Sequence, residues 1–161
     1  MAARRLPRVC WDSNCWISLI VGTHDRLPGL KRVAEAAERG ELEIITSFLA
    51  MAETAKGRSA PNDPSTQTTL ETIRAAFELD YLIPVLVDRS VAYRAQELLR
   101  KYKLRGADGV HLAIALLQAA DELHTWDSDL LAIDGQEVAS HGATLRIKPA
   151  DWTAQQALPT A

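Results

Sequence analysis

The sequence has few cysteines and no long hydrophobic run, and each of these absences excludes a class of protein. Only two cysteines, Cys10 and Cys15, occur in 161 residues, so a disulfide framework does not hold the fold together. Their spacing is not that of a C-x2-C zinc site, and no second cysteine or histidine cluster completes one. We therefore expect two small, buried apolar side chains. No apolar stretch approaches the length needed to span a bilayer.

The sequence also lacks the pattern of a secretory signal. Arg4, Arg5 and Arg8 are not followed by an apolar segment that ends in a small-residue cleavage site. We therefore expect a cytoplasmic protein that has no membrane partner.

An excess of positive charge is missing as well. The formal net charge is -3, whereas proteins that bind duplex nucleic acid along its phosphates are usually basic. This charge argues against a large phosphate-tracking surface. It does not argue against a local nucleic-acid site, because bound metal ions can supply the positive charge there.

Short apolar segments alternate with helical patterns along the chain. The expected strands are 9–11, 42–45, 82–87, 123–126 and 142–149, and the expected helices are 14–21, 31–39, 46–56, 68–79, 89–102 and 110–120. This alternation predicts an α/β domain of three layers, α/β/α, with a central parallel sheet. The length suits a single domain, which we place at 1–152, with a C-terminal tail at 153–161.

Acidic residues follow the expected strands. Asp12 ends the first strand and Asp127 ends the fourth. Glu53 lies two turns into the helix after the second strand, and Asp108 begins a buried helix after "LRGA". Ligands of parallel sheets bind beyond the carboxyl ends of the strands, so we expect these four carboxylates to converge there.

Converging carboxylates repel each other, and hard divalent cations remove that repulsion. Magnesium prefers oxygen ligands and needs only one or two protein carboxylates. Two such ions about 4 Å apart can activate a water and stabilise a leaving oxygen, which predicts phosphodiester hydrolysis. The alternative is that each acid is an ordinary surface residue or helix cap, because the chain has 21 acids.

Five segments together resemble one family. They are "WDSNCWISLI", "ITSFLAMAET", "GADGVHLAIAL", "HTWDSDLLAI" and "LRIKPADW". In this order they resemble the PIN-domain ribonucleases, most of all the VapC-type toxins of toxin–antitoxin pairs. The resemblance implies a PIN-like domain with about five parallel strands between helices. It also implies an endoribonuclease that uses Mg²⁺ or Mn²⁺, forms a homodimer and is inhibited by a cognate antitoxin protein.

The resemblance also assigns roles to particular residues. The implied catalytic acids are Asp12, Glu53, Asp108 and Asp127, and the implied metal ligands are Asp12, Asp108 and Asp127. Asn14 would orient Asp12, and the hydroxyl of Thr125 would support Asp127. Asp129 would be an outer-shell or second-metal residue, or else an acid that stabilises a helix N-terminus.

Several neighbouring residues have two interpretations. Four basic residues flank Glu53 and Asp108 and would hold RNA phosphates, or they are solvated helix ends: Lys56, Arg58, Lys103 and Arg105. We expect His111 to be a satisfied core residue rather than part of the site. We expect Trp11 and Trp126 to pack into the helix layers, because neighbouring strand residues point to opposite faces.

Two other functions compete with a nuclease. One is a PIN-like module that binds RNA or protein without cutting. The other is a magnesium-dependent phosphohydrolase of small phosphate esters, which the sequence disfavours because it has no D-x-D-x-T motif and no phosphate-binding glycine-rich loop.

Overall fold

The fold is built on a five-stranded sheet in which every pairing is parallel. The computed structural model describes residues 4–54 and 64–153. The strands are β1 (Arg8–Trp11), β2 (Glu43–Ser47), β3 (Leu82–Val85), β4 (Glu122–His124) and β5 (Arg146–Lys148), in the order β3-β2-β1-β4-β5. The expected parallel sheet is confirmed, and the carboxyl ends of all five strands lie along one edge.

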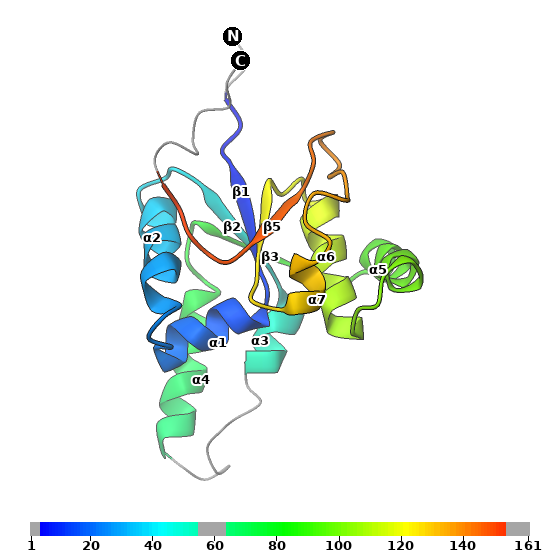
Figure 1. The fold of residues 1–161 in the computed structure, drawn as a ribbon. Coiled ribbons are helices and arrows are strands. Elements are labelled where there is room, and N and C mark those ends of the chain that lie inside the picture. Colours follow the sequence, from blue (N-terminus) through cyan, green and yellow to red (C-terminus); the bar gives the residue numbers. More distant parts are fainter. Residues whose placement is uncertain (1–3, 55–63, 154–161) are drawn as a thin grey trace.

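Helices cover both faces of this sheet (Figure 1). They are α1 (Ser13–Val21), α2 (Leu27–Glu38), α3 (Phe48–Thr54), α4 (Pro64–Ala76), α5 (Arg89–Lys101), α6 (Gly106–Leu117) and α7 (Ser128–Leu131). One apolar core contains residues of α1, α2 and α4, and a second core contains residues of α5, α6 and α7. The three-layer α/β/α architecture expected from the sequence is therefore confirmed.

The central strand β1 contributes side chains to both cores. Cys10 packs in the core beside α6, whereas Val9 and Trp11 pack in the core beside α1, as the alternation of a strand requires. Both cysteines are free and buried, as expected. Trp11 contacts Trp16 edge-to-face, with their ring centroids 4.9 Å apart.

Trp126 is partly buried against the same core, and the guanidinium of Arg26 lies 4.8 Å from its ring centroid. Both tryptophans thus pack into the helix layers as predicted.

Several element boundaries differ from those expected, for local reasons. Helix α2 begins four residues early, at Leu27, because Pro28 stands in its first turn, a position that proline favours. It ends where expected, with Gly40 in a left-handed conformation at φ 74°. Strand β3 ends at Val85 instead of continuing to residue 87. Helix α6 begins at Gly106, so Asp108 stands in its first turn.

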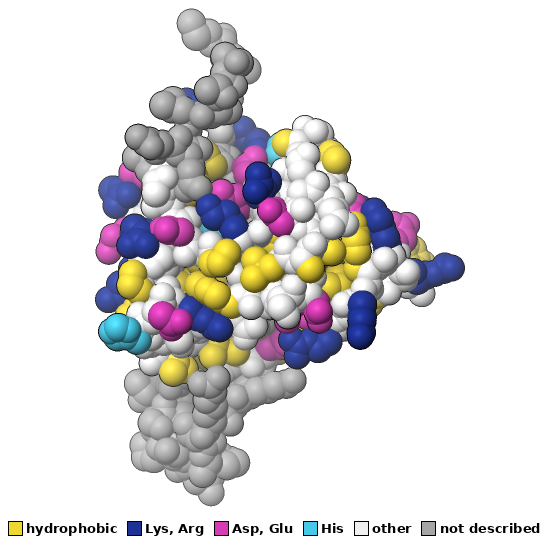
Figure 2. All heavy atoms as spheres, viewed as in Figure 1, with side chains coloured by type: hydrophobic (Ala, Val, Ile, Leu, Met, Phe, Trp, Pro, Cys, Tyr) yellow, Lys and Arg dark blue, Asp and Glu magenta, His cyan; other side chains and the backbone are white. Residues whose placement is uncertain are grey.

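Charges of both signs are interspersed on the face shown in Figure 2, and apolar side chains gather across its middle. The described residues of this face therefore form no continuous cationic surface. In the part of the chain that the structure describes, no helix is long and apolar enough to cross a membrane.

Candidate active site

Asp12 lies at the centre of the candidate site, immediately after β1. It is the N-cap of α1, and its Oδ1 accepts a hydrogen bond from the backbone N–H of Cys15 at 3.1 Å. Its Oδ2 accepts a hydrogen bond from the hydroxyl of Thr125 at 2.5 Å. Asp12 is only 2% exposed, and these two donors compensate the burial of its charge.

Thr125 connects Asp12 to the segment that carries Asp127. Its Oγ1 also accepts a hydrogen bond from the backbone N–H of Asp127 at 3.0 Å. The carboxylate of Asp127 caps α7, since its Oδ1 accepts hydrogen bonds from the N–H groups of Asp129 and Leu130. Thr125 therefore positions the backbone of Asp127 by accepting a hydrogen bond from it, and its own hydroxyl donates a hydrogen bond to Asp12.

Asp108 approaches from α6, and Arg105 lies between it and Asp127. The Arg105 Nε donates to Asp108 Oδ2 at 3.3 Å, and Nη2 donates to Asp127 Oδ2 at 3.0 Å. Burial raises the pKa of Asp108, the negative charge of Asp127 raises it further, and Arg105 offsets part of this rise. A bound cation would favour the ionised form of Asp108.

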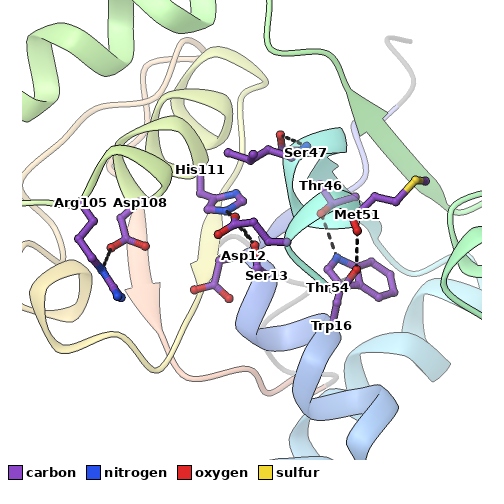
Figure 3. A network of polar contacts seen from close by, with 12 residues as sticks. Asp12, Ser13, Trp16, Thr46, Ser47, Met51, Thr54, Arg105, Asp108 and His111 are labelled. Carbon is purple, nitrogen blue, oxygen red and sulfur yellow. Dashed lines mark hydrogen bonds and ion pairs between the residues drawn. The ribbon is translucent and has the colours of Figure 1, made fainter. Parts of the chain in front are cut away.

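Glu53 belongs to a cluster with Ser13 and His111. The Ser13 hydroxyl donates to Glu53 Oε1 at 2.6 Å. The His111 Nε2 lies 3.0 Å from the same oxygen and 3.1 Å from Ser13 Oγ. Figure 3 shows His111 pointing toward Ser13, with Asp12 beside them.

The expectation that His111 is a satisfied core residue was wrong. Its Nε2 faces Glu53, and its buried Nδ1 has no hydrogen-bond partner among the described residues. The sequence contained one signal for this placement, since His111 follows Asp108 by three residues and so shares its helix face.

These side chains line a pocket of about 430 Å³ at the carboxyl edge of the sheet. Its lining residues are Asp12, Ser13, Asn14, Ile17, Glu53, Arg105, Ala107, Asp108 and His111. Three of the four expected acids thus share one pocket. The fourth, Asp127, is connected to it through Thr125 and Arg105.

The residues expected to support the site lie in different surroundings, and only some of them line the pocket. Asn14 lines the pocket, but among the described residues no hydrogen bond joins it to Asp12, whose carboxylate is held by Cys15 and Thr125. Asp129 is exposed and contacts Asp127 through its backbone N–H. Of the four expected RNA-binding residues, Lys103 and Arg105 are exposed, whereas Lys56 and Arg58 lie outside the described residues.

The donor chemistry of this pocket fits a hard divalent cation. Carboxylate oxygens are the ligands that Mg²⁺ and Mn²⁺ prefer, and Mg²⁺ needs only one or two of them from the protein. Across residues 4–54 and 64–153, no group of three or more His, Cys, Asp or Glu side chains is gathered closely enough to hold an ion. Asp12, Asp108 and Asp127 are the side chains that would hold such a cation, and Arg105 contacts two of them.

Comparison with known proteins identifies the family. The model of the PIN domain matches residues 9–136, a range that includes Asp12, Glu53, Asp108 and Asp127. The chain belongs to the PIN domain family. No curated protein sequence matches it.

Solved structures of the same fold include toxins of toxin–antitoxin pairs. A toxin–antitoxin complex from Klebsiella pneumoniae is 24% identical, with 78% of this chain and 92% of that chain covered and a TM-score of 0.58. VapC20 of Mycobacterium tuberculosis, a toxin that cleaves the sarcin–ricin loop, is 16% identical, with coverage of 75% and 91% and a TM-score of 0.59. VapBC2 of Rickettsia felis, bound to a promoter DNA fragment, is 15% identical, with coverage of 87% and 98% and a TM-score of 0.60.

Proposed function

We propose that this PIN domain is a divalent-metal-dependent endoribonuclease that hydrolyses RNA phosphodiester bonds and acts as the toxin of a toxin–antitoxin pair. The observation that carries the proposal is the shared pocket of Asp12, Glu53 and Asp108, with Asp127 tied to it through Thr125 and Arg105. The acids sit at the sheet edge where parallel α/β domains bind ligands.

Asp12, Asp108 and Asp127 would hold Mg²⁺ or Mn²⁺, and Glu53 completes the acidic pocket. When bound, such an ion lowers the pKa of a water and stabilises charge on the phosphate. The chain itself fixes Asp12 through Cys15 and Thr125, and it fixes Glu53 through Ser13 and His111. A water oxygen forms the new bond to phosphorus and the bond to the 3′ oxygen breaks, so the products carry 5′-phosphate and 3′-hydroxyl ends.

The partners we infer are RNA, a cognate antitoxin and a second copy of this chain, in the cytoplasm. The structures from Klebsiella pneumoniae and Rickettsia felis are toxin–antitoxin assemblies, which supports an antitoxin partner. We propose that Arg105, which lines the pocket, and Lys103, which is also exposed, contact RNA phosphates. Lys56, Arg58, Asn14 and Asp129 keep their proposed supporting roles. Light scattering during gel filtration tests the dimer.

A non-cleaving module that binds RNA or protein is the second candidate. It is favoured because no group of three or more metal-ligating side chains is gathered among the described residues, and because the Arg105 guanidinium pairs with both Asp108 and Asp127. Such a module would bind RNA equally well with EDTA or Mn²⁺ and would cut it in neither.

The test is to incubate total RNA with the purified protein, free of any inhibitor, in Mn²⁺ and in EDTA. We expect cleavage only with Mn²⁺, and we expect the new fragments to be degraded by an exonuclease that requires a 5′-phosphate. Cleavage that persists in EDTA, or fragments with 5′-hydroxyl ends, would contradict the mechanism. No cleavage by folded protein under either condition would favour the binding module.

A further inference from the structure

Arg105 makes an unusual pair of contacts for a residue so exposed. It precedes α6 as its N-cap residue, and its guanidinium bridges Asp108 and Asp127, which belong to different segments of the chain. The Arg105 side chain is 74% exposed, whereas those of Asp108 and Asp127 are 11% and 12% exposed. An exposed guanidinium therefore pairs with two carboxylates that are nearly buried, and its contact with Asp108 is drawn in Figure 3.

The two carboxylates need a positive charge between them. Both side chains are nearly buried, and the Arg105 guanidinium contacts each of them, at 3.3 Å and 3.0 Å, where it offsets their mutual repulsion. A guanidinium supplies one charge through a flexible, solvated side chain, and ion pairs of such exposed groups contribute little to stability. A divalent ion supplies twice the charge and binds the carboxylate oxygens directly.

We propose that Arg105 and the divalent cation compete for the carboxylates of Asp108 and Asp127. Arg105 occupies this position in the metal-free protein and leaves it when the ion binds. The inference rests on the proposed metal site. It goes beyond the proposed catalytic function because it makes one side chain of the toxin itself a determinant of metal affinity.

Displacement would leave Arg105 where an RNA substrate needs a cation. The residue lines the wall of the pocket, and its backbone is held as the first carbonyl acceptor of α6. Once freed, the guanidinium remains at the rim and can contact a phosphate oxygen in a bidentate manner. Metal binding and the availability of this phosphate contact are therefore coupled.

The test is a Mn²⁺ titration of the metal-free protein at pH 8, followed by electron paramagnetic resonance of the free ion. The variants are Arg105→Gln and Arg100→Gln. Arg100 is an exposed residue in the last turn of α5, and it is not among the cations paired with either carboxylate. We expect Arg105→Gln to bind Mn²⁺ about three- to tenfold more tightly than the wild type, since it lacks the competing ion pairs. Arg100→Gln should change the affinity less than about twofold, because screening weakens a charge that touches no ligand.

Thermal unfolding gives a second readout that does not depend on activity. Without metal, Arg105→Gln should unfold at a lower temperature than the wild type, and saturating Mn²⁺ should remove most of that difference. Equal or weaker Mn²⁺ binding by Arg105→Gln would overturn the inference while leaving the proposed metal site intact. No Mn²⁺ binding by any of the three proteins would overturn the metal site and this inference together.

Discussion

Thr125 is the residue that joins the two acids following β1 and β4. Its hydroxyl donates to Asp12 and accepts from the backbone of Asp127, so one side chain positions both. The sequence placed Thr125 near Asp127, but it could not show the bond to Asp12. That bond requires β4 to lie beside β1 in the register that pairs Trp11 with His124, which is a property of the sheet.

Replacing Thr125 by valine keeps the shape of the side chain and removes both hydrogen bonds. We expect RNA cleavage and Mn²⁺ affinity to fall about 10- to 100-fold, as is typical when a group that orients a metal ligand is lost. Thr125→Ser keeps the hydroxyl and should retain most of both. Cleavage and Mn²⁺ affinity at the wild-type level in Thr125→Val would contradict the positioning role of these hydrogen bonds.

Replacing Asp108 by asparagine should abolish cleavage, with a loss of more than about 100-fold, and should stabilise the metal-free protein. The raised pKa of Asp108 means that the folded state binds its proton more tightly than the unfolded state. This contribution to stability is present at low pH and is lost as the pH rises through the raised pKa. Asparagine does not ionise, so the stability of the Asp108→Asn variant should not fall as the pH rises through this pKa.

The measurement for Asp108→Asn is the urea midpoint of each protein from about pH 4 to pH 8 in EDTA. The advantage of the variant over the wild type should grow as the pH rises. Asp25→Asn, at an exposed position, removes the same charge and serves as the control. A variant that is less stable than the wild type at pH 8 would contradict the assigned cost of ionising Asp108.

At the scale of helices and strands, α6 positions two side chains of the site, because it carries both Asp108 and His111. It packs closely on α5, and a Cβ added at Gly109 would lie 2.8 Å from the Leu99 side chain. The apolar pattern of residues 110–120 predicted a buried helix correctly. It could not show which face meets the pocket, since apolar residues surround this helix on all sides, and so the position of His111 in the pocket was not predicted.

Gly109→Ala should therefore force α6 away from α5. We expect a loss of about 1–3 kcal/mol of stability from overpacking, together with reduced cleavage as Asp108 shifts. Gly106→Ala is the matched control, because the space around a Cβ there is open within 4 Å and alanine favours the helix. Chemical denaturation distinguishes the two, and equal stability of both variants would contradict the close packing of α5 on α6.

At the scale of the whole molecule, the alternation of strands and helices was enough to predict the architecture. Parallel pairing follows from crossover helices, and the edge that binds ligands follows from parallel pairing. The acids could therefore be placed at one edge from the sequence alone. The bridge formed by Arg105 could not be predicted, because it depends on how closely the loop before α6 approaches the segment after β4.

If the proposed metal site exists, Mn²⁺ should raise the free energy of unfolding of the whole domain. A ligand that binds only the folded state at about 100 times its dissociation constant adds about 2.7 kcal/mol to the free energy of unfolding. For a domain of this size that corresponds to a rise of about 5–10 °C in the melting temperature with Mn²⁺. Calorimetry with Mn²⁺ and with EDTA measures this rise, and identical melting temperatures would argue against a folded metal site.

The central claim is that the acid after β1 is part of a nuclease site, and one comparison tests it most directly. Wild-type protein, Asp12→Asn and the control Asp25→Asn, each shown to be folded by circular dichroism, are incubated with total RNA in Mn²⁺. Asparagine keeps the N-cap of α1 but not the charge of the carboxylate. We predict that wild type and Asp25→Asn cut RNA at the same positions and that Asp12→Asn cuts at least about 100-fold more slowly. Cutting by Asp12→Asn at the wild-type rate would contradict the account.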